Sequence, residues 1–326
     1  MNNITIGQYI PGNSWLHKLD PRIKLLSLVI ILVGTFLIPI SAQMVSLISM
    51  VALFVIIIIL TMTTGVPMKK VLNGLKPIVF LLTFTFFIQV FYVRTGDILF
   101  GPITMHISLT SIVGIILFII FYNMTKKYIK FRVLYFFFAA ISVFVLQAIL
   151  PYVSFTTYQV SIYDEGLLRA GFIFLRITNV IMITSLLTFT TMTTDLNYGI
   201  EALLKPLKII KVPVDVIAMM LSLTLRYIPT LLGETEKIMK AQASRGVDFK
   251  ESKFKEKVVQ IVSLLIPVFV ISFKRAEDLG NAMEVRGYII GAKRTKVDQY
   301  QIGVSDYFSL LASVMILAAI IYVRIM

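Results

Sequence analysis

The sequence predicts an all-α, polytopic membrane protein with about seven transmembrane helices and additional long amphipathic helices on the cytoplasmic side. Its 326 residues are 58% hydrophobic and have a mean hydropathy of +0.89, whereas soluble domains contain only about 45–50% apolar residues. Apolar runs recur along the chain, and basic residues gather between them. A bilayer supplies the apolar solvent that this composition requires.

Each predicted span is a mostly apolar stretch of about 20 residues, which is the length that crosses the hydrocarbon core as a helix. Only Pro39–Ser41 separates the first two spans, which predicts a tight helical hairpin. The seven stretches are Ile23–Pro39, Ala42–Met62, Leu75–Val93, Ile107–Met124, Phe131–Leu150, Leu167–Thr191 and Val304–Ile325.

The loops between these spans alternate between rich and poor in basic residues, as the positive-inside rule requires. Of the loops that are poor in basic residues, the first has none, the second holds Arg94 and Asp97, and the third holds Asp164 and Glu165 without a basic residue. This pattern predicts a multi-pass protein of the cell membrane with a cytoplasmic N-terminus, and it explains the net charge of +14 without any nucleic-acid partner. The rich loops contain Lys18, Arg22 and Lys24; Lys69, Lys70 and Lys76; and Lys126, Lys127, Lys130 and Arg132.

The chain divides into a membrane domain over residues 1–194, a cytoplasmic-side domain over 195–300 and a C-terminal span over 301–326. The middle domain holds more than half of all Lys and Arg residues, together with two apolar patches at 216–232 and 258–273. Pro229 and Pro267 interrupt these patches, and the first patch also contains Arg226. Hydropathy alone allows two further spans here; we favour amphipathic helices at the inner membrane face.

Two helix ends in the middle domain resemble each other. Glu236–Gly246 aligns without gaps on Glu277–Gly287 at an offset of 41 residues, and both segments end in Arg-Gly. The helical periodicity places Phe269 and Phe273 on an apolar stripe and turns Glu234 and Arg275 away from the stripes. The charged residues at Lys274–Asp278 either form a solvated, self-paired face or pair with charges beside the first of the two helices.

The Arg-Gly pairs allow two interpretations. Glycine supplies the left-handed residue that ends many helices, and arginine complements the negative end of the helix dipole. Alternatively, each arginine projects from a rigid helix tip into an acidic or carbonyl-lined groove on a partner, where its fork of donors binds with defined geometry.

Several motifs in order along the chain resemble the transmembrane (T) component of energy-coupling factor (ECF) transporters, the EcfT/CbiQ family. The resemblance covers residues 16–103 and 164–326. Between these ranges, an additional helical hairpin at about 104–163 departs from the family pattern. The matching motifs are Leu16–Leu25, Thr193–Leu207, Leu225–Leu232 with Glu234, Ala241–Asp248, Lys274–Leu279 and Ala282–Tyr288.

This resemblance implies a non-catalytic scaffold that couples two cytoplasmic ABC-type ATPases to a substrate-binding (S) membrane subunit during uptake of a vitamin or other micronutrient. The family's two coupling helices end in Ala-Arg-Gly motifs that dock on the ATPases. The equivalent residues here are Ser244, Arg245 and Gly246, and Val285, Arg286 and Gly287, so both alanines are replaced. The residues implied to support the coupling helices are Arg226, Pro229, Glu234, Pro267, Arg275 and Glu277.

The sequence argues against an enzyme and against a metal or cofactor site. It has no cysteine and only two histidines, His17 and His106, which lie in different regions. It has no Gly-x-x-x-x-Gly-Lys-Ser/Thr motif, so ATP hydrolysis is expected in a separate chain. A secondary transporter would favour inverted repeats, and a membrane-embedded enzyme would show clustered acid–base residues; we find neither pattern.

Two local predictions concern the membrane domain. Asp20 and Pro21 form a helix start, with Asp20 as the cap and Pro21 in the first turn. Arg176 lies inside the sixth span, where a charged side chain is costly, and we expect it to bind a polar group of a neighbouring helix.

Overall fold

The computed structural model describes residues 9–40, 44–126, 132–149, 154–247, 254–292 and 300–325. These residues are mostly helical and fall into two compact units. The larger unit comprises Gln8–Lys18, Leu26–Thr190 and Phe308–Met326. The smaller unit contains Leu19–Leu25 and Thr191–Tyr307, together with an N-terminal segment outside the described residues.

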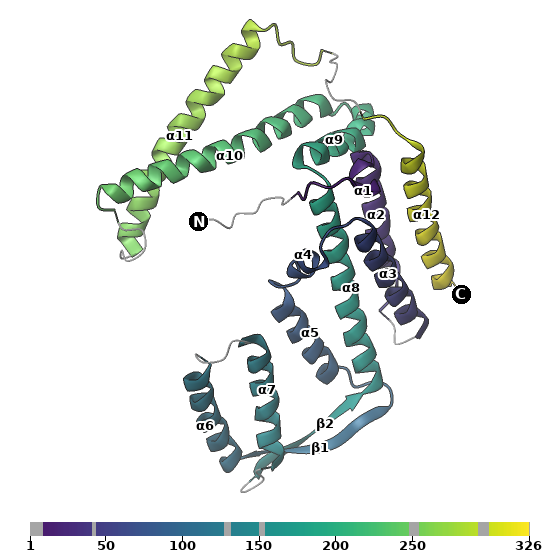
Figure 1. Ribbon diagram of the computed structural model, residues 1–326. Helices are drawn as coiled ribbons and strands as arrows, with labels where there is room; N and C mark the ends of the chain where they lie inside the picture. Colours follow the sequence, from purple (N-terminus) through teal and green to yellow (C-terminus); the bar gives the residue numbers. More distant parts are fainter. Residues whose placement is uncertain are drawn as a thin grey trace. The chain divides into compact units, whose positions relative to one another are not determined.

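The core of the larger unit lies among its long helices, with α3 and α5 packed along α8 (Figure 1). Phe172 and Met182 of α8 are almost fully buried and join Met50 and Ile57 of α3 in one apolar cluster. The helices with residues in this unit are α1 (Trp15–Lys18), α2 (Pro21–Leu37), α3 (Met44–Thr63), α4 (Met68–Asn73), α5 (Val79–Tyr92), α6 (Leu109–Thr125), α7 (Arg132–Ile149), α8 (Asp164–Thr190) and α12 (Val304–Ile325).

Every one of the seven predicted spans contains a helix, and the all-α membrane fold is confirmed. Within the described residues, five helices are long and apolar enough to cross a membrane: α3, α8, α10, α11 and α12. Helices α5 and α6 and most of α7 are apolar but shorter. Ser41 of the predicted link and the first two residues of the second predicted span, at 42–43, lie outside the described residues.

A two-stranded antiparallel ribbon was not predicted from the sequence. Strands β1 (Ile98–Ser108) and β2 (Ser154–Tyr163) pair along their length, with His106 opposite Thr157. The fourth span therefore begins later than expected: Ile107 belongs to β1, and Ser108 caps α6 through a reciprocal bond with Ser111. The extra hairpin is thus a pair of helices, α6 and α7, carried at the end of a ribbon (Figure 1).

Arg176 binds a neighbouring helix, as expected from its place inside a span. Its Nη2 donates to the carbonyl of Ile38, just after the C-terminal end of α2. Its guanidinium also stacks on Phe172, 4.6 Å from the ring centroid. The arginine therefore satisfies a carbonyl that has no partner within its own helix.

The smaller unit is built on α9 (Thr193–Leu204), a short 3₁₀ helix η1 (Lys205–Ile210), α10 (Val214–Ser244) and α11 (Phe254–Val285). The side chain of Asn197, buried on α9, donates to Ser222 of α10 and ties these two helices together. Asp20 caps α2 as predicted, because its Oδ1 accepts a 2.8 Å bond from the backbone N–H of Arg22.

Candidate functional site

The two long helices of the smaller unit cross each other (Figure 1). At the crossing, Nη2 of Arg275 on α11 donates to Oε1 of Glu234 on α10. Both side chains are half-buried, with 34% and 23% of their surfaces exposed. The helical periodicity turned both residues away from the apolar stripes, and of the two arrangements left open for the charges around Arg275, the structure shows pairing with the neighbouring helix.

Helix α10 ends in a paired set of backbone hydrogen bonds that is characteristic of a Schellman motif. The N–H of Val247 donates to the carbonyl of Gln242 over 3.1 Å, and the N–H of Gly246 donates to Ala243 over 3.0 Å. Gly246 adopts φ +88°, the left-handed conformation that this motif requires. Arg245 is the last residue before that glycine.

Helix α11 ends in the same way. The N–H of Tyr288 donates to Met283 over 3.0 Å, and the N–H of Gly287 donates to Glu284 over 2.9 Å. Gly287 has φ +71°. The local interpretation, in which glycine ends each helix, is therefore correct at both sites. Because both ends share one geometry, Arg245 and Arg286 leave their helices at equivalent points.

The side chains at both tips are exposed. Neither the guanidinium of Arg245 nor that of Arg286 has a hydrogen bond or ion pair within the part of the chain that the structure describes. Val285 is 89% exposed, and Ser244 uses its hydroxyl to bond the carbonyl of Lys240 over 3.1 Å. The tips thus offer two available guanidinium groups.

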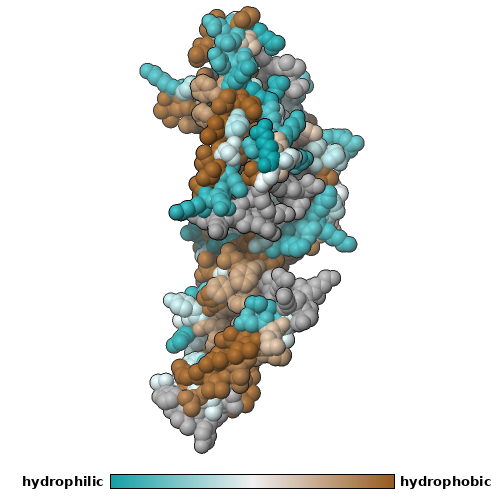
Figure 2. Space-filling view, turned by 90° about the vertical axis from the view of Figure 1, so that its left-hand side faces the viewer, coloured by the Kyte–Doolittle hydropathy of each residue, from teal (hydrophilic) through white to brown (hydrophobic). Residues whose placement is uncertain are grey.

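The apolar stripe predicted on α11 is left uncovered at Phe269 and Phe273. Phe269 and Phe273 are each 68% exposed, and their rings lie against each other with centroids 6.1 Å apart. The covered face instead includes Pro267 and Arg275, which are half-buried. Figure 2 shows hydrophobic and hydrophilic side chains interleaved over the upper part, where α10 and α11 lie.

The remaining predicted support residues lie at the surface. Arg226, Pro229 and Glu277 are exposed, and Pro229 and Pro267 both sit inside uninterrupted helices. Of these predicted residues, the structure therefore brings together Glu234 and Arg275 only, and the side chains of Arg226 and Glu277 have no hydrogen bond or ion pair among the described residues.

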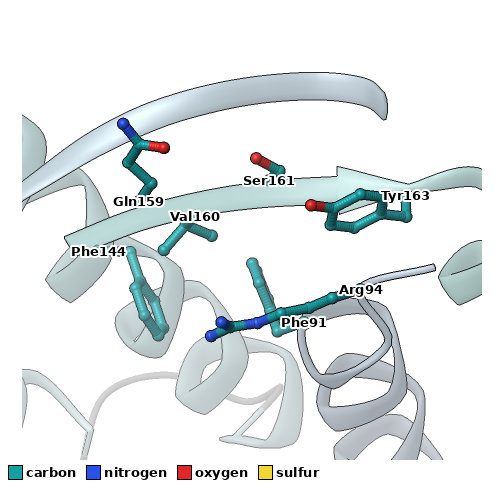
Figure 3. A pocket seen from close by; sticks show the side chains of 7 residues that line it. All are labelled: Phe91, Arg94, Phe144, Gln159, Val160, Ser161 and Tyr163. Carbon is teal, nitrogen blue, oxygen red and sulfur yellow. The ribbon is translucent and has the colours of Figure 1, made fainter. Parts of the chain in front are cut away.

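A cavity of about 240 Å³ lies in the larger unit, where α5 and α7 meet β2. Figure 3 shows the Arg94 side chain below the strand, beside Phe91 and Phe144, while Gln159 and Ser161 point to the opposite side of the strand. This volume is below the roughly 300–1,000 Å³ of typical ligand pockets. The described residues also hold no group of three or more His, Asp or Glu side chains arranged for a metal ion.

Comparison with known proteins agrees with the motif pattern. Residues 97–297 match the family model CbiQ, described as cobalt transport protein. The energy-coupling factor transporter transmembrane protein EcfT of Bacillus subtilis is 36% identical over 322 residues, which cover 99% of this chain and 98% of that protein. The chain belongs to the CbiQ/EcfT family.

Other relatives in the CbiQ/EcfT family agree over similar lengths. The EcfT protein of Streptococcus equi subsp. equi is 36% identical over 296 residues, covering 91% of this chain and 87% of that protein. The EcfT protein of Clostridium kluyveri is 33% identical over 325 residues, covering 100% of this chain and 98% of that protein. The family match also includes residues 104–163, the predicted additional hairpin, so that segment lies within the aligned length.

Proposed function

We propose that this protein is the non-catalytic scaffold of an ECF-type ABC importer, coupling two cytoplasmic ABC-type ATPases to an S subunit that binds a vitamin or other micronutrient. The observation that carries the proposal is that both helices end in the same pattern of backbone hydrogen bonds and each end presents an exposed arginine. The family membership supplies the transporter context. In this proposal, Ser244–Gly246 and Val285–Gly287 are the ATPase-docking motifs.

The chemistry of the tips suits docking on a soluble subunit. A guanidinium keeps its charge and offers several donors in a fixed plane, so it recognises carboxylates or carbonyls with defined orientation. A rigid helix behind each arginine transmits a displacement of the groove along its axis. The exposed apolar residues of α11, including Phe269 and Phe273, would then contact the S subunit or the bilayer.

In the membrane arrangement we propose, the N-terminus and residues 195–300 lie on the cytoplasmic side. The basic loops before α2, before α5 and between α6 and α7 support it, because basic loops are retained in the cytoplasm. Helices α10 and α11 would lie along the inner face, although their length and composition alone also fit spanning helices.

Co-purification tests this function. An affinity-tagged chain, solubilised in mild detergent from its native cells, is expected to recover two ABC-type ATPases and a small S-type membrane protein. Mass spectrometry identifies the recovered chains and their stoichiometry. Recovery of the tagged chain alone, with substrate transport in ATP-free vesicles, would instead indicate a secondary transporter.

The glycines at the tips provide a sharper test of the helix-end geometry. Gly246→Ala and Gly287→Ala are each expected to destabilise the observed helix end by about 1 kcal/mol, because a Cβ disfavours the left-handed conformation. If docking depends on that end geometry, ATPase binding weakens about fivefold to tenfold per substitution. Titration of the purified ATPases against the chain in detergent measures the change.

Gly233→Ala and Gly280→Ala are matched controls within the same two helices. No atom lies within 4 Å of a Cβ built at either position. Alanine is favoured over glycine inside a helix by roughly 0.5–1 kcal/mol. These variants should keep or improve ATPase binding. Equal binding by all four variants would contradict the dependence on the helix-end geometry.

A further inference from the structure

The ion pair at the helix crossing joins equivalent positions of the sequence repeat. Glu234 and Arg275 are 41 residues apart, which is also the offset between Arg245 and Arg286 and between Gly246 and Gly287. When two similar helices touch at equivalent positions, a local two-fold axis passes through the contact. This axis therefore relates the tip of α10 to the tip of α11.

The two arms beyond the crossing are equal in length. Eleven residues lead from Glu234 to Arg245, and eleven lead from Arg275 to Arg286. At about 1.5 Å per residue, each arm extends roughly 16 Å. Eleven residues also make close to three helical turns, so each arginine returns to about the same helix face as the ion-pair residue.

We propose that the Glu234–Arg275 ion pair is a pivot that fixes the spacing and symmetry of the two docking arginines. This inference rests on the proposed function and adds a positioning role for two residues that do not touch the ATPases. With equal arms about a fixed point, the tips fit a partner made of two similar subunits arranged about one two-fold axis.

The Glu234–Arg275 pair is suited to this role because it is partly buried and because it joins two different helices. Both side chains are partly withdrawn from water, where a charge-assisted hydrogen bond is stronger than at an open surface. The neighbouring pair Glu236–Lys240 differs in both respects: it lies within α10, its atoms are 4.0 Å apart, and its side chains are 52% and 78% exposed. Only the first pair connects the two arms.

The experiment measures the distance between the arms directly. The chain has no cysteine, so Lys237→Cys and Asp278→Cys introduce spin labels at two exposed positions that are equivalent in the repeat. Pulsed electron paramagnetic resonance gives the distance distribution for the full chain alone and for its complex with the ATPases, with and without ATP and vanadate. The unmodified background is compared with Glu234→Gln, with the charge swap Glu234→Arg/Arg275→Glu, and with Glu236→Gln as the control.

The unmodified background and Glu236→Gln are expected to give one narrow distance distribution. Glu234→Gln should broaden it and remove the nucleotide-dependent shift, while ATPase co-purification persists because the tips are intact. The charge swap should restore the narrow distribution, which a general loss of helix stability would not do. The pivot is overturned if Glu234→Gln matches Glu236→Gln, or if the charge swap stays as broad as the single variant. Absence of ATPases from the unmodified complex would overturn the proposed function instead, since the chain alone still reports on the pivot.

Discussion

Replacing Arg245 and Arg286 together by glutamate is expected to remove both ATPases from the purified complex. Each guanidinium is exposed and has no partner among the described residues of this chain, so the substitution leaves the helices themselves intact. Truncating one member of a buried interfacial charge pair costs about 2–5 kcal/mol. Reversing two charges should therefore weaken docking by more than roughly a thousandfold.

Single substitutions distinguish the contributions of the two tips to ATPase docking. If the tips dock on two subunits of one ATPase pair, the intact tip holds the complex partly together through its high effective concentration. Arg245→Glu or Arg286→Glu alone should then reduce the recovered ATPase without abolishing it. Arg→Lys at both tips keeps the charge but loses the planar fork, and an intermediate loss is expected.

The matched control is the same change of charge elsewhere on α10. Lys237→Glu and Lys240→Glu alter two exposed positions one or two turns before the tip. They should leave the recovered ATPase unchanged, as measured by quantitative mass spectrometry of the affinity-purified complex. A double Arg→Glu variant that still carries both ATPases at the unmodified stoichiometry would contradict the docking role.

The helical skeleton was predictable because its signals are local. Apolar runs of sufficient length located the seven helices α2, α3, α5, α6, α7, α8 and α12, and the two apolar patches lie in α10 and α11. Asp20-Pro21 marked the start of α2. Arg-Gly marked the ends of α10 and α11, because the left-handed residue that closes a Schellman motif is usually glycine. These features depend on residues within a few positions of one another.

The β1–β2 ribbon was missed although part of its signal was present. Ile103–Ser108 alternates apolar and polar residues with the period of a strand. Because a long apolar run follows it directly, the sequence analysis assigned most of this segment to the helical hairpin. Its partner strand lies beyond two helices, at Ser154–Tyr163. Pairing over such a separation leaves no mark in the local sequence.

What covers α11 was also beyond local reasoning. A helical wheel finds an apolar stripe, here including Phe269 and Phe273, but it does not show what covers the stripe, and the structure leaves both rings 68% exposed. In a membrane protein, an apolar stripe can face lipid or a partner as readily as the chain's own core. The sequence allowed Arg275 to pair with a charge on the neighbouring helix, but the choice of Glu234 depends on where the two helices cross.

Asp306 is a structurally important residue that the sequence analysis did not identify. Its Oδ1 accepts a 2.8 Å bond from the backbone N–H of Asp20, which is 286 residues away. Its Oδ2 accepts a 2.7 Å bond from the N–H of Gly303, at the start of α12. One carboxylate therefore joins the starts of α2 and α12.

Asp306→Ala is expected to destabilise the protein strongly. The side chain is part of a residue that is only 4% exposed, and its loss leaves two backbone N–H groups without their acceptor. The N–H of Asp20 is buried, and leaving it unpaired costs about 1–3 kcal/mol, whereas the N–H of the exposed residue Gly303 can bond to water. The expected loss is a substantial part of a typical folding free energy of roughly 5–15 kcal/mol. Asp306 and Asp20 are also among the carboxylates that interact electrostatically with buried Lys24.

The thermal unfolding midpoint of the detergent-purified protein, together with its yield in the membrane fraction, measures this effect. Asp306→Asn retains one carbonyl acceptor and should fall between the alanine variant and the unmodified protein. Asp278→Ala, which removes an exposed carboxylate from α11, is the control and should unfold like the unmodified protein. If Asp306→Ala unfolds at the same temperature as Asp278→Ala, the carboxylate does not hold the two helix starts together, and the buried N–H of Asp20 finds another acceptor.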